Sequence, residues 1–218
     1  MEGGSYPMNS ISITASEVSK EFDRRLIFKD ISFSLSSPAS LSITGKNGAG
    51  KSTLSKIIAG VLSPTHGTVT YSDHEKQMGI EEFKHQIGFV SPYLNLYDEF
   101  TALENLQILS RIRMAAQENG ERIAELLRSV GLWNRRNDLV GTFSSGMKQR
   151  LKYAFALLHA PALLILDEPT SNLDAEGIEM VQHIVLQQKK ENILIIATNN
   201  DEEARWCVQQ IQTGKIQK

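Results

Sequence analysis

The chain has 218 residues, of which 41% are hydrophobic, and its 23 basic and 25 acidic residues leave a formal net charge of −2 at pH 7. This composition supports a buried core, which excludes a disordered chain, and the lack of a basic excess argues against nucleic acid as a partner. The single cysteine, Cys207, excludes an internal disulfide. Its neighbours Trp206 and Val208 favour a small core residue over a reactive thiol.

The first part of the chain is predicted to be mostly β-structure around one helix. Residues 1–10 have no basic region followed by an apolar one, so they are expected to form a flexible tail and not a signal peptide. No run of about 18 apolar residues predicts a membrane span. Alternating or short apolar runs predict strands around 11–13, 31–35, 41–44, 67–72 and 87–90, and a helix over 51–59 is expected to end at Gly60.

The middle of the chain is predicted to be helical. Thr101 and Glu104 have the spacing of a capping box, and leucines at helical spacing follow them. This helix is expected to stop at Asn119-Gly120, and a second helix over 121–129 is expected to close at Gly131. A third, amphipathic helix is predicted over 145–158.

Strands and a helix are predicted to alternate in the last part of the chain. The apolar runs 163–167 and 192–198 are typical of buried parallel strands, and Asp174 is expected to cap a helix from 175 to about 189. The end resembles a closing hairpin around Thr213-Gly214. The fold class is therefore α/β, with an antiparallel edge and an inserted helical subdomain. A single domain is expected over 1–218, with its core at 11–91 and 159–218 and the helical subdomain at 92–158.

The segment "SITGKNGAGKST", residues 42–53, combines a strand, glycines, a lysine and hydroxyls in the order of a phosphate-binding P-loop. Glycines at such positions let consecutive backbone N–H groups surround an anion, and the following helix adds the positive end of its dipole. The lysine is expected to reach the β- and γ-phosphates and the serine to ligate Mg²⁺. The predicted nucleotide-binding residues of this motif are Gly45, Lys46, Asn47, Gly48, Ala49, Gly50, Lys51, Ser52 and Thr53.

A second motif supplies acidic groups for the same site. The run "LLILDEP" places Asp167 at the end of a buried strand and Glu168 directly after it. Asp167 and Ser52 are expected to hold the metal ion, and Glu168 to act as a general base or to orient the attacking water. The two motifs together predict a protein that binds a nucleoside triphosphate with Mg²⁺.

Between these motifs, "FSSGMKQRL" (143–151) resembles the signature motif of the ATPase subunits of ABC transporters, with Ser144 and Gly146 at matching positions. The segment "SNLD" (171–174) resembles the D-loop of that family. "VSKEF" (18–22) resembles the segment whose aromatic residue stacks on adenine, which makes Phe22 the expected platform, with plain core packing as the alternative.

The resemblance implies a P-loop NTPase core of the ABC type and ATP as the nucleotide. It implies a homodimer or heterodimer in which two subunits pair head to tail, so that each signature closes on the ATP of the other. It also implies transmembrane permease subunits as partners, contacted near residues 91–105, and a cytoplasmic protein bound peripherally to the inner face of the membrane. "TALENL" and the signature are most similar to exporter subunits, including the haem-exporter type.

Two positions depart from the family pattern. Pro92 stands where the family has a glutamine that contacts Mg²⁺ and water, and Asn199 stands where the family has a histidine at the γ-phosphate. An amide can hydrogen-bond a phosphate but cannot carry charge. Asn199 is therefore expected to be a catalytic residue that supports only slow ATP hydrolysis. Two alternatives follow: a slow or regulatory ATP-binding module acting on a soluble partner, and an ABC ATPase of DNA repair or ribosome work. The second fits poorly, because this length has no room for a long coiled coil or a tandem copy.

Overall fold

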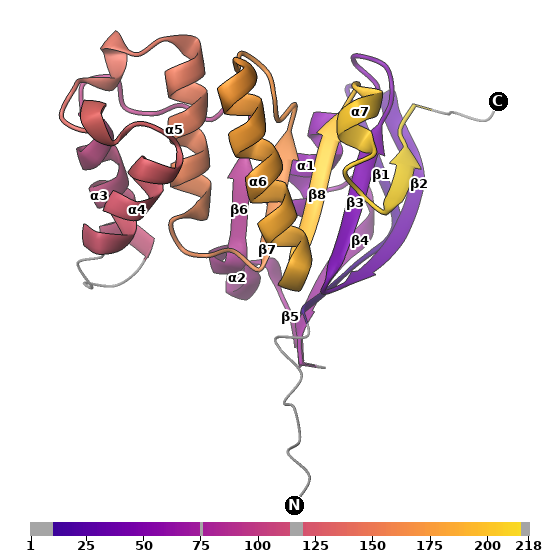
Figure 1. The fold of residues 1–218 in the computed structure, drawn as a ribbon. Coiled ribbons are helices and arrows are strands. Elements are labelled where there is room, and N and C mark those ends of the chain that lie inside the picture. The colour runs from indigo at the N-terminus through magenta and orange to yellow at the C-terminus, as the bar shows by residue number, and fades with distance from the viewer. Residues whose placement is uncertain (1–10, 75, 114–119, 215–218) are drawn as a thin grey trace, which may run out of the picture.

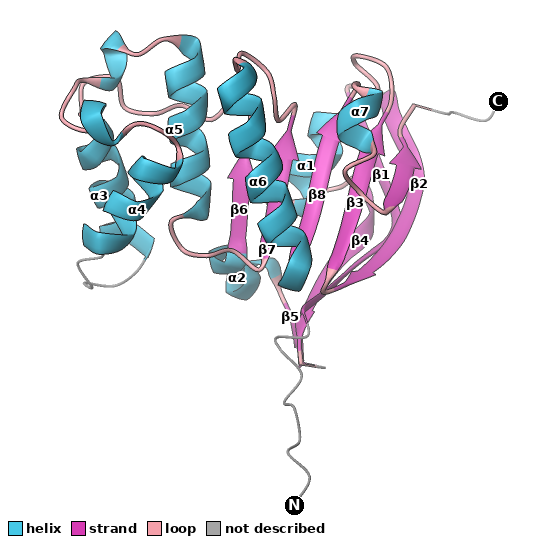
Figure 2. Ribbon diagram, viewed as in Figure 1, coloured by secondary structure: helices cyan, strands magenta, loops and turns pink. Residues whose placement is uncertain are grey.

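The computed structural model describes residues 11–74, 76–113 and 120–214 of the chain. Two sheets lie next to each other, and a block of helices stands against one end of the second sheet (Figures 1 and 2). None of the helices within the described ranges is long and apolar enough to cross a membrane.

The first sheet is antiparallel and has the strand order β2-β1-β4-β5. Ile13 of β1 faces Leu35 of β2 on one side and Tyr71 of β4 on the other, and all three side chains are buried. The expected antiparallel edge is therefore confirmed, with longer strands than the sequence pattern predicts. The strands are β1 (Ile11–Phe22), β2 (Arg25–Ser36), β4 (His66–Asp73) and β5 (Lys76–Met78).

The second sheet is parallel throughout and has the order β6-β7-β8-β3-β9. Its strands are β3 (Ala39–Thr44), β6 (Ile87–Val90), β7 (Leu163–Asp167), β8 (Ile193–Thr198) and β9 (Gln209–Gln212). Because parallel strands end at one edge, the residues that follow Thr44, Asp167 and Thr198 gather there.

The predicted closing hairpin differs from the observed end of the chain. The segment 209–212 does form a strand, but it pairs in parallel with β3, and the N–H of Thr213 donates to the carbonyl of Thr44 at 2.8 Å. A return strand after Gly214 would lie outside the described residues. The chain reaches β9 after passing over the sheet through α7 (Asp201–Ala204), so β9 enters in the direction of its neighbours.

Two helices cover opposite faces of the parallel sheet, α1 (Lys51–Ile58) on one and α6 (Ala175–Glu191) on the other (Figure 1). Side chains alternate along β7, so that Leu163 and Ile165 join α1 and the antiparallel sheet in one core. Leu164 and Leu166 join α6 and the helical block in a second core. A strand that is buried on both faces explains the uninterrupted apolar run in the sequence.

The helical block consists of α3 (Ala102–Arg113), α4 (Gly120–Ser129) and α5 (Ser145–Leu157). The capping box is confirmed: the hydroxyl of Thr101 accepts from the N–H of Glu104 at 3.1 Å, and the carboxylate of Glu104 accepts in return from the N–H of Thr101 at 2.8 Å. Gly131 has φ +73° just after α4, as expected. The predicted stop at Asn119 lies outside the described residues, and Gly120 begins α4.

Short helices complete the connections: α2 (Ile80–Phe83) and the 3₁₀ turns Lys84–Gln86, Trp133–Arg135 and Val140–Thr142.

Candidate functional site

The loop between β3 and α1 has the backbone that an anion cradle needs. Gly45, Gly48 and Gly50 adopt φ values of +148°, +80° and +93°, a region that side chains disfavour. At Gly50 a Cβ atom would lie 2.6 Å from a side-chain carbon of Ile27, so any other residue there would have to displace Ile27 as well as adopt an unfavourable φ. The loop leads into the first turn of α1, where backbone N–H groups have no partner within the helix.

Lys51 lies almost fully buried beneath this loop, with a side chain that is 5% exposed. Its ammonium donates to the carbonyls of Gly45 at 3.0 Å and Lys46 at 3.4 Å, and lies 3.7 Å from Oε1 of Glu168. The charge is therefore held under the loop, where it can turn to a phosphate group placed in the cradle.

Asp167 is fully buried at the end of β7, and its Oδ1 accepts a hydrogen bond from the Ser52 hydroxyl at 2.9 Å. Its Oδ2 has no hydrogen-bond partner among the described residues. Burial raises the pKa of Asp167 above its ordinary value, and the Ser52 hydrogen bond opposes that rise. A buried carboxylate oxygen without a partner, next to a hydroxyl, fits the oxygen ligands that Mg²⁺ prefers.

Glu168 follows in the left-handed region with φ +52°, and its N–H donates to the carbonyl of Ala197 on β8 at 2.8 Å. Its side chain is 30% exposed. Partial burial raises the pKa of Glu168, and the Lys51 ammonium opposes this effect. The arrangement gives a carboxylate that is fixed by its backbone, faces Lys51 and can reach water.

Asn199, directly after β8, contacts the cradle. Its Nδ2 donates to Oδ1 of Asn47 at 2.9 Å, so the two loops that follow β3 and β8 are joined by an amide pair. The structure thus brings together the cradle, Lys51, Ser52, Asp167, Glu168 and Asn199, all from the carboxyl edge of the parallel sheet.

Phe22 ends β1 and is 45% exposed, which argues against the core-packing alternative. The Nζ of Lys20 lies 4.8 Å from the centre of its ring. The hairpin that carries Phe22 also places Ile27 and Phe28 against Gly50, so the exposed ring belongs to a hairpin that adjoins the cradle. A flat exposed aromatic group in this place can stack on a base.

Ser144 and Gly146 lie elsewhere, at the start of α5 in the helical block. Ser144 is the N-cap residue, and its hydroxyl accepts from the N–H of Met147 at 3.2 Å. Both residues line an open hollow that also includes Arg150 and Asp174. No residue of the cradle lines this hollow. The signature therefore presents the N-terminus of α5 to this hollow and not to the cradle.

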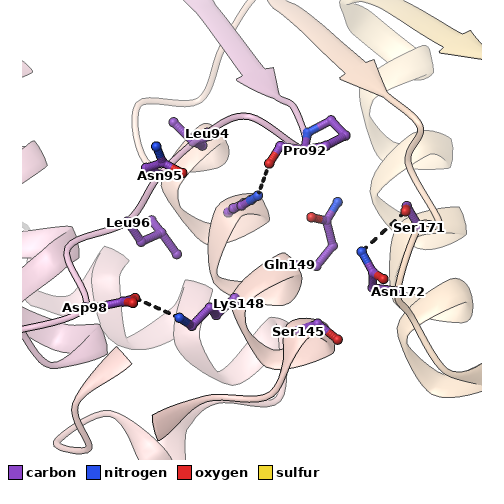
Figure 3. Close-up of a pocket in the computed structure, with 11 residues that line it drawn as sticks. Pro92, Leu94, Asn95, Leu96, Asp98, Ser145, Lys148, Gln149, Ser171 and Asn172 are labelled. Atoms are coloured by element: carbon purple, nitrogen blue, oxygen red, sulfur yellow. Dashed lines mark hydrogen bonds and ion pairs between the residues drawn. The ribbon is translucent and has the colours of Figure 1, made fainter. Parts of the chain in front are cut away.

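Pro92 lies in a segment tied to α5 by cations that the sequence motifs do not reveal (Figure 3). Lys152 donates to the carbonyls of Ser91 at 3.2 Å and Pro92 at 3.0 Å, and Lys148 pairs with Asp98 at 2.8 Å. Lysines four residues apart on one helix face are a signal that could have pointed to this contact. At the position where the family has a glutamine, the backbone carbonyl of Pro92 is thus held by Lys152 of α5.

The chain matches known proteins along most of its length. Residues 28–171 match the family model described as ABC transporter. The chain is 33% identical to the uncharacterised ABC transporter ATP-binding protein YybJ of Bacillus subtilis (strain 168), over 85% of this chain and 84% of that protein. It is 34% identical to Nod factor export ATP-binding protein I of Rhizobium leguminosarum bv. viciae, over 95% of this chain and 68% of that protein.

Two solved structures share the fold. An ATP-binding subunit of an ABC transporter superimposes with a TM-score of 0.81 at 28% identity, over 92% of this chain and 85% of the other. A dimeric ATP-binding cassette in a post-hydrolysis state with ADP and Pi gives a TM-score of 0.81 at 25% identity, over 92% of this chain and 94% of the other. Since the family model spans both halves of the nucleotide site, the chain belongs to the ABC transporter family, as an ATP-binding subunit and an ATPase.

Proposed function

We propose that ATP lies in the cradle with its phosphates on the loop 45–50 and on Lys51, and with its adenine on Phe22. The observation that carries this proposal is the hydrogen bond from the half-buried Ser52 to the fully buried Asp167, whose second carboxylate oxygen has no hydrogen-bond partner among the described residues. Ser52 and Asp167 would hold Mg²⁺, which would neutralise charge on the phosphate oxygens. Glu168 orients the attacking water, and Asn199 contacts the γ-phosphate.

The same proposal includes an ATP-driven head-to-tail dimer. Ser144 and Gly146 present the N-terminus of α5 in an open hollow away from the cradle, which supports contact with the γ-phosphate of a second subunit. The solved relative with ADP and Pi is described as dimeric, which supports the pairing. ATP then closes the pair of subunits, and hydrolysis releases them.

Turnover is proposed to be slow because two polar groups of the family pattern are missing. Asn199 offers a neutral amide, and hydrogen bonds to charged groups are worth about twice neutral ones. A loss of about 1.4–3 kcal/mol in the transition state would lower turnover about 10- to 150-fold.

We propose that ATP hydrolysis by this chain drives transport through transmembrane permease subunits. These subunits would hold the chain at the inner face of the membrane. An apolar hollow between the sheet core and the helical block supports this contact. It is lined by Val61, 66% exposed, and Ile112, 75% exposed, together with Phe89 and Phe155, and it reaches the expected contact segment 91–105 at Leu94. Large exposed apolar side chains around a concave surface are typical of a protein contact.

The alternative is a module that acts on a soluble partner. A tagged chain recovered from detergent-solubilised membranes of its own cells should bring polytopic membrane proteins with it, identified by mass spectrometry. Val61→Glu and Ile112→Glu should lose these proteins while binding Mg-ATP as the parent does. Leu186→Glu, a change at a 59% exposed residue on the distant face of α6, is the control and should keep them. Equal recovery with both groove variants would contradict the proposed docking site, and recovery of soluble proteins alone would favour the module.

A further inference from the structure

A buried carboxylate, that of Glu203, lies behind the nucleotide site and has no role in the site described so far. Glu203 belongs to the short helix α7 and is 3% exposed, whereas the preceding acids Asp201 and Glu202 are exposed. Among the described residues, no lysine, arginine or histidine forms an ion pair with Glu203. A buried acid without a cation is costly unless hydrogen bonds satisfy both of its oxygens.

Two threonine hydroxyls satisfy this carboxylate, one on each oxygen. Thr170 donates to Oε1, and Thr198 donates to Oε2. The Thr198 hydroxyl also accepts from the N–H of Asn200 at 3.0 Å. Glu203 is therefore a bridge between two segments that are far apart in the sequence.

The two bridged segments carry the groups proposed to act on the γ-phosphate. Thr170 lies in the turn that follows Glu168, and Thr198 directly precedes Asn199. The middle of the turn is also held, because the carbonyl of Pro169 accepts from the buried hydroxyl of Tyr153 on α5 at 2.7 Å. Moving the Glu203 carboxylate would release both segments at their attachment points.

The turn at Glu168 needs such support. Its φ of +52° is unfavourable for any residue with a Cβ atom, and such backbones persist only where the surroundings fix them. The contact of the Glu168 N–H with Ala197 fixes the start of the turn, and the contact of Thr170 with Glu203 holds it two residues further on.

We propose that Glu203 is a positioning residue for ATP hydrolysis, whose two hydrogen bonds hold the Glu168 turn and the Asn199 segment in one fixed arrangement. The inference rests on the roles proposed above for Glu168 and Asn199. Glu203 makes no hydrogen bond to the cradle, which is built by β3 and α1 and is joined to the Asn199 segment by the Asn47–Asn199 amide pair. Loss of the Glu203 carboxylate should therefore change ATP affinity little and lower the rate of hydrolysis.

The test compares Glu203→Ala, Glu203→Gln and the parent at matched protein concentration and saturating Mg-ATP. In Glu203→Ala the Kd for ATP should stay within about threefold of the parent, while kcat per binding site falls about 10- to 100-fold because the reacting groups are displaced. Glutamine can accept from one threonine and donate to the other, so Glu203→Gln should recover most of the lost kcat.

Gln188→Ala is the matched control. Gln188 is also buried, at 7% exposed, and its Nε2 donates to the carbonyls of Pro161 at 3.0 Å and Ile193 at 3.3 Å, at the far end of β8. Its loss should lower the melting temperature and leave kcat per site unchanged. If Glu203→Ala fails to fold, Thr170→Val and Thr198→Val each remove one bond and should each lower kcat severalfold.

Three results would overturn the inference. The first is a parental kcat in Glu203→Ala, or in both threonine variants. The second is an equal loss of kcat in Gln188→Ala, and the third is a Glu203→Gln variant as slow as Glu203→Ala. Glu168→Gln in the same assay distinguishes failure of the proposed function from failure of the positioning role. A parental kcat in Glu168→Gln contradicts the proposed function. A low kcat in Glu168→Gln together with a parental kcat in Glu203→Ala contradicts only the positioning role.

Discussion

Replacing Lys51 by methionine tests the cradle most directly, because it removes a charge and keeps the length of the side chain. The Lys51 ammonium contacts only the carbonyls of Gly45 and Lys46 and the carboxylate of Glu168 among the described residues. Gly45 and Lys46 are not buried, so water can replace the lost donor. The free protein should therefore lose little stability.

ATP binding should suffer much more. A hydrogen bond to a charged group is worth about 1.5–3 kcal/mol, so two contacts with the β- and γ-phosphates contribute about 3–6 kcal/mol. This loss weakens the Kd about 10²- to 10⁴-fold. At an ATP concentration 100 times the parent Kd, the parent gains about 2.7 kcal/mol of stability, and the variant gains about 0.4 kcal/mol or less.

Thermal unfolding with and without Mg-ATP measures this difference. For a chain of this size 1 kcal/mol shifts Tm by about 2–4 °C, so the parent should gain about 5–11 °C and the variant at most about 2 °C. Lys56→Met is the control, since Lys56 lies on the same helix but over the ring of Tyr93, at 4.4 Å from its centre. An ATP-induced shift in Lys51→Met as large as that of the parent would refute the assignment of the phosphate cradle.

Three further outcomes are expected. Glu168→Gln should bind ATP and accumulate as a dimer in size-exclusion chromatography with Mg-ATP, whereas the parent stays mostly monomeric; a monomeric variant at high ATP would contradict the head-to-tail pairing. Asn199→His should raise and Asn199→Ala lower steady-state ATPase activity at matched dimer fraction, and an Asn199→Ala variant as fast as the parent would remove Asn199 from the γ-phosphate. Cys207 is half-buried, and burial raises the pKa of its thiol to about 12, so a thiol reagent at pH 8 should label the folded protein much more slowly than the protein unfolded in guanidinium; equally fast labelling of both would contradict the raised pKa.

Local sequence signals were sufficient for much of the fold. The strand 163–167 was predicted with its observed bounds, because an apolar run that short between a proline and an acidic turn fits only a strand buried on both faces. The caps at Thr101 and Asp174 were predicted because they depend on residues three positions apart. The cradle was predicted for the same reason, since its glycines, lysine and serine are contiguous.

Contacts between distant segments could not be predicted. Three acids stand in a row at 201–203, and only the packing of α7 decides that Glu203 is the buried one. The amide pair of Asn47 and Asn199 depends on β3 and β8 being neighbours, which no local pattern reports. The parallel pairing of β9 was missed because the pattern around Thr213 predicts a turn but not the direction of the strand before it.

The alternation of side chains along β7 limits how the helical block can move. Leu164 and Leu166 of the strand belong to the same packed cluster as Leu151 of α5 and Leu106 of α3, so the block and the sheet share one interior. Opening a gap between them would expose this cluster to water at a cost of about 25 cal/mol for each Å² of apolar surface. We therefore expect any reorientation of the signature relative to the cradle to proceed by shear, a small sliding of helices over the sheet that keeps the cluster closed.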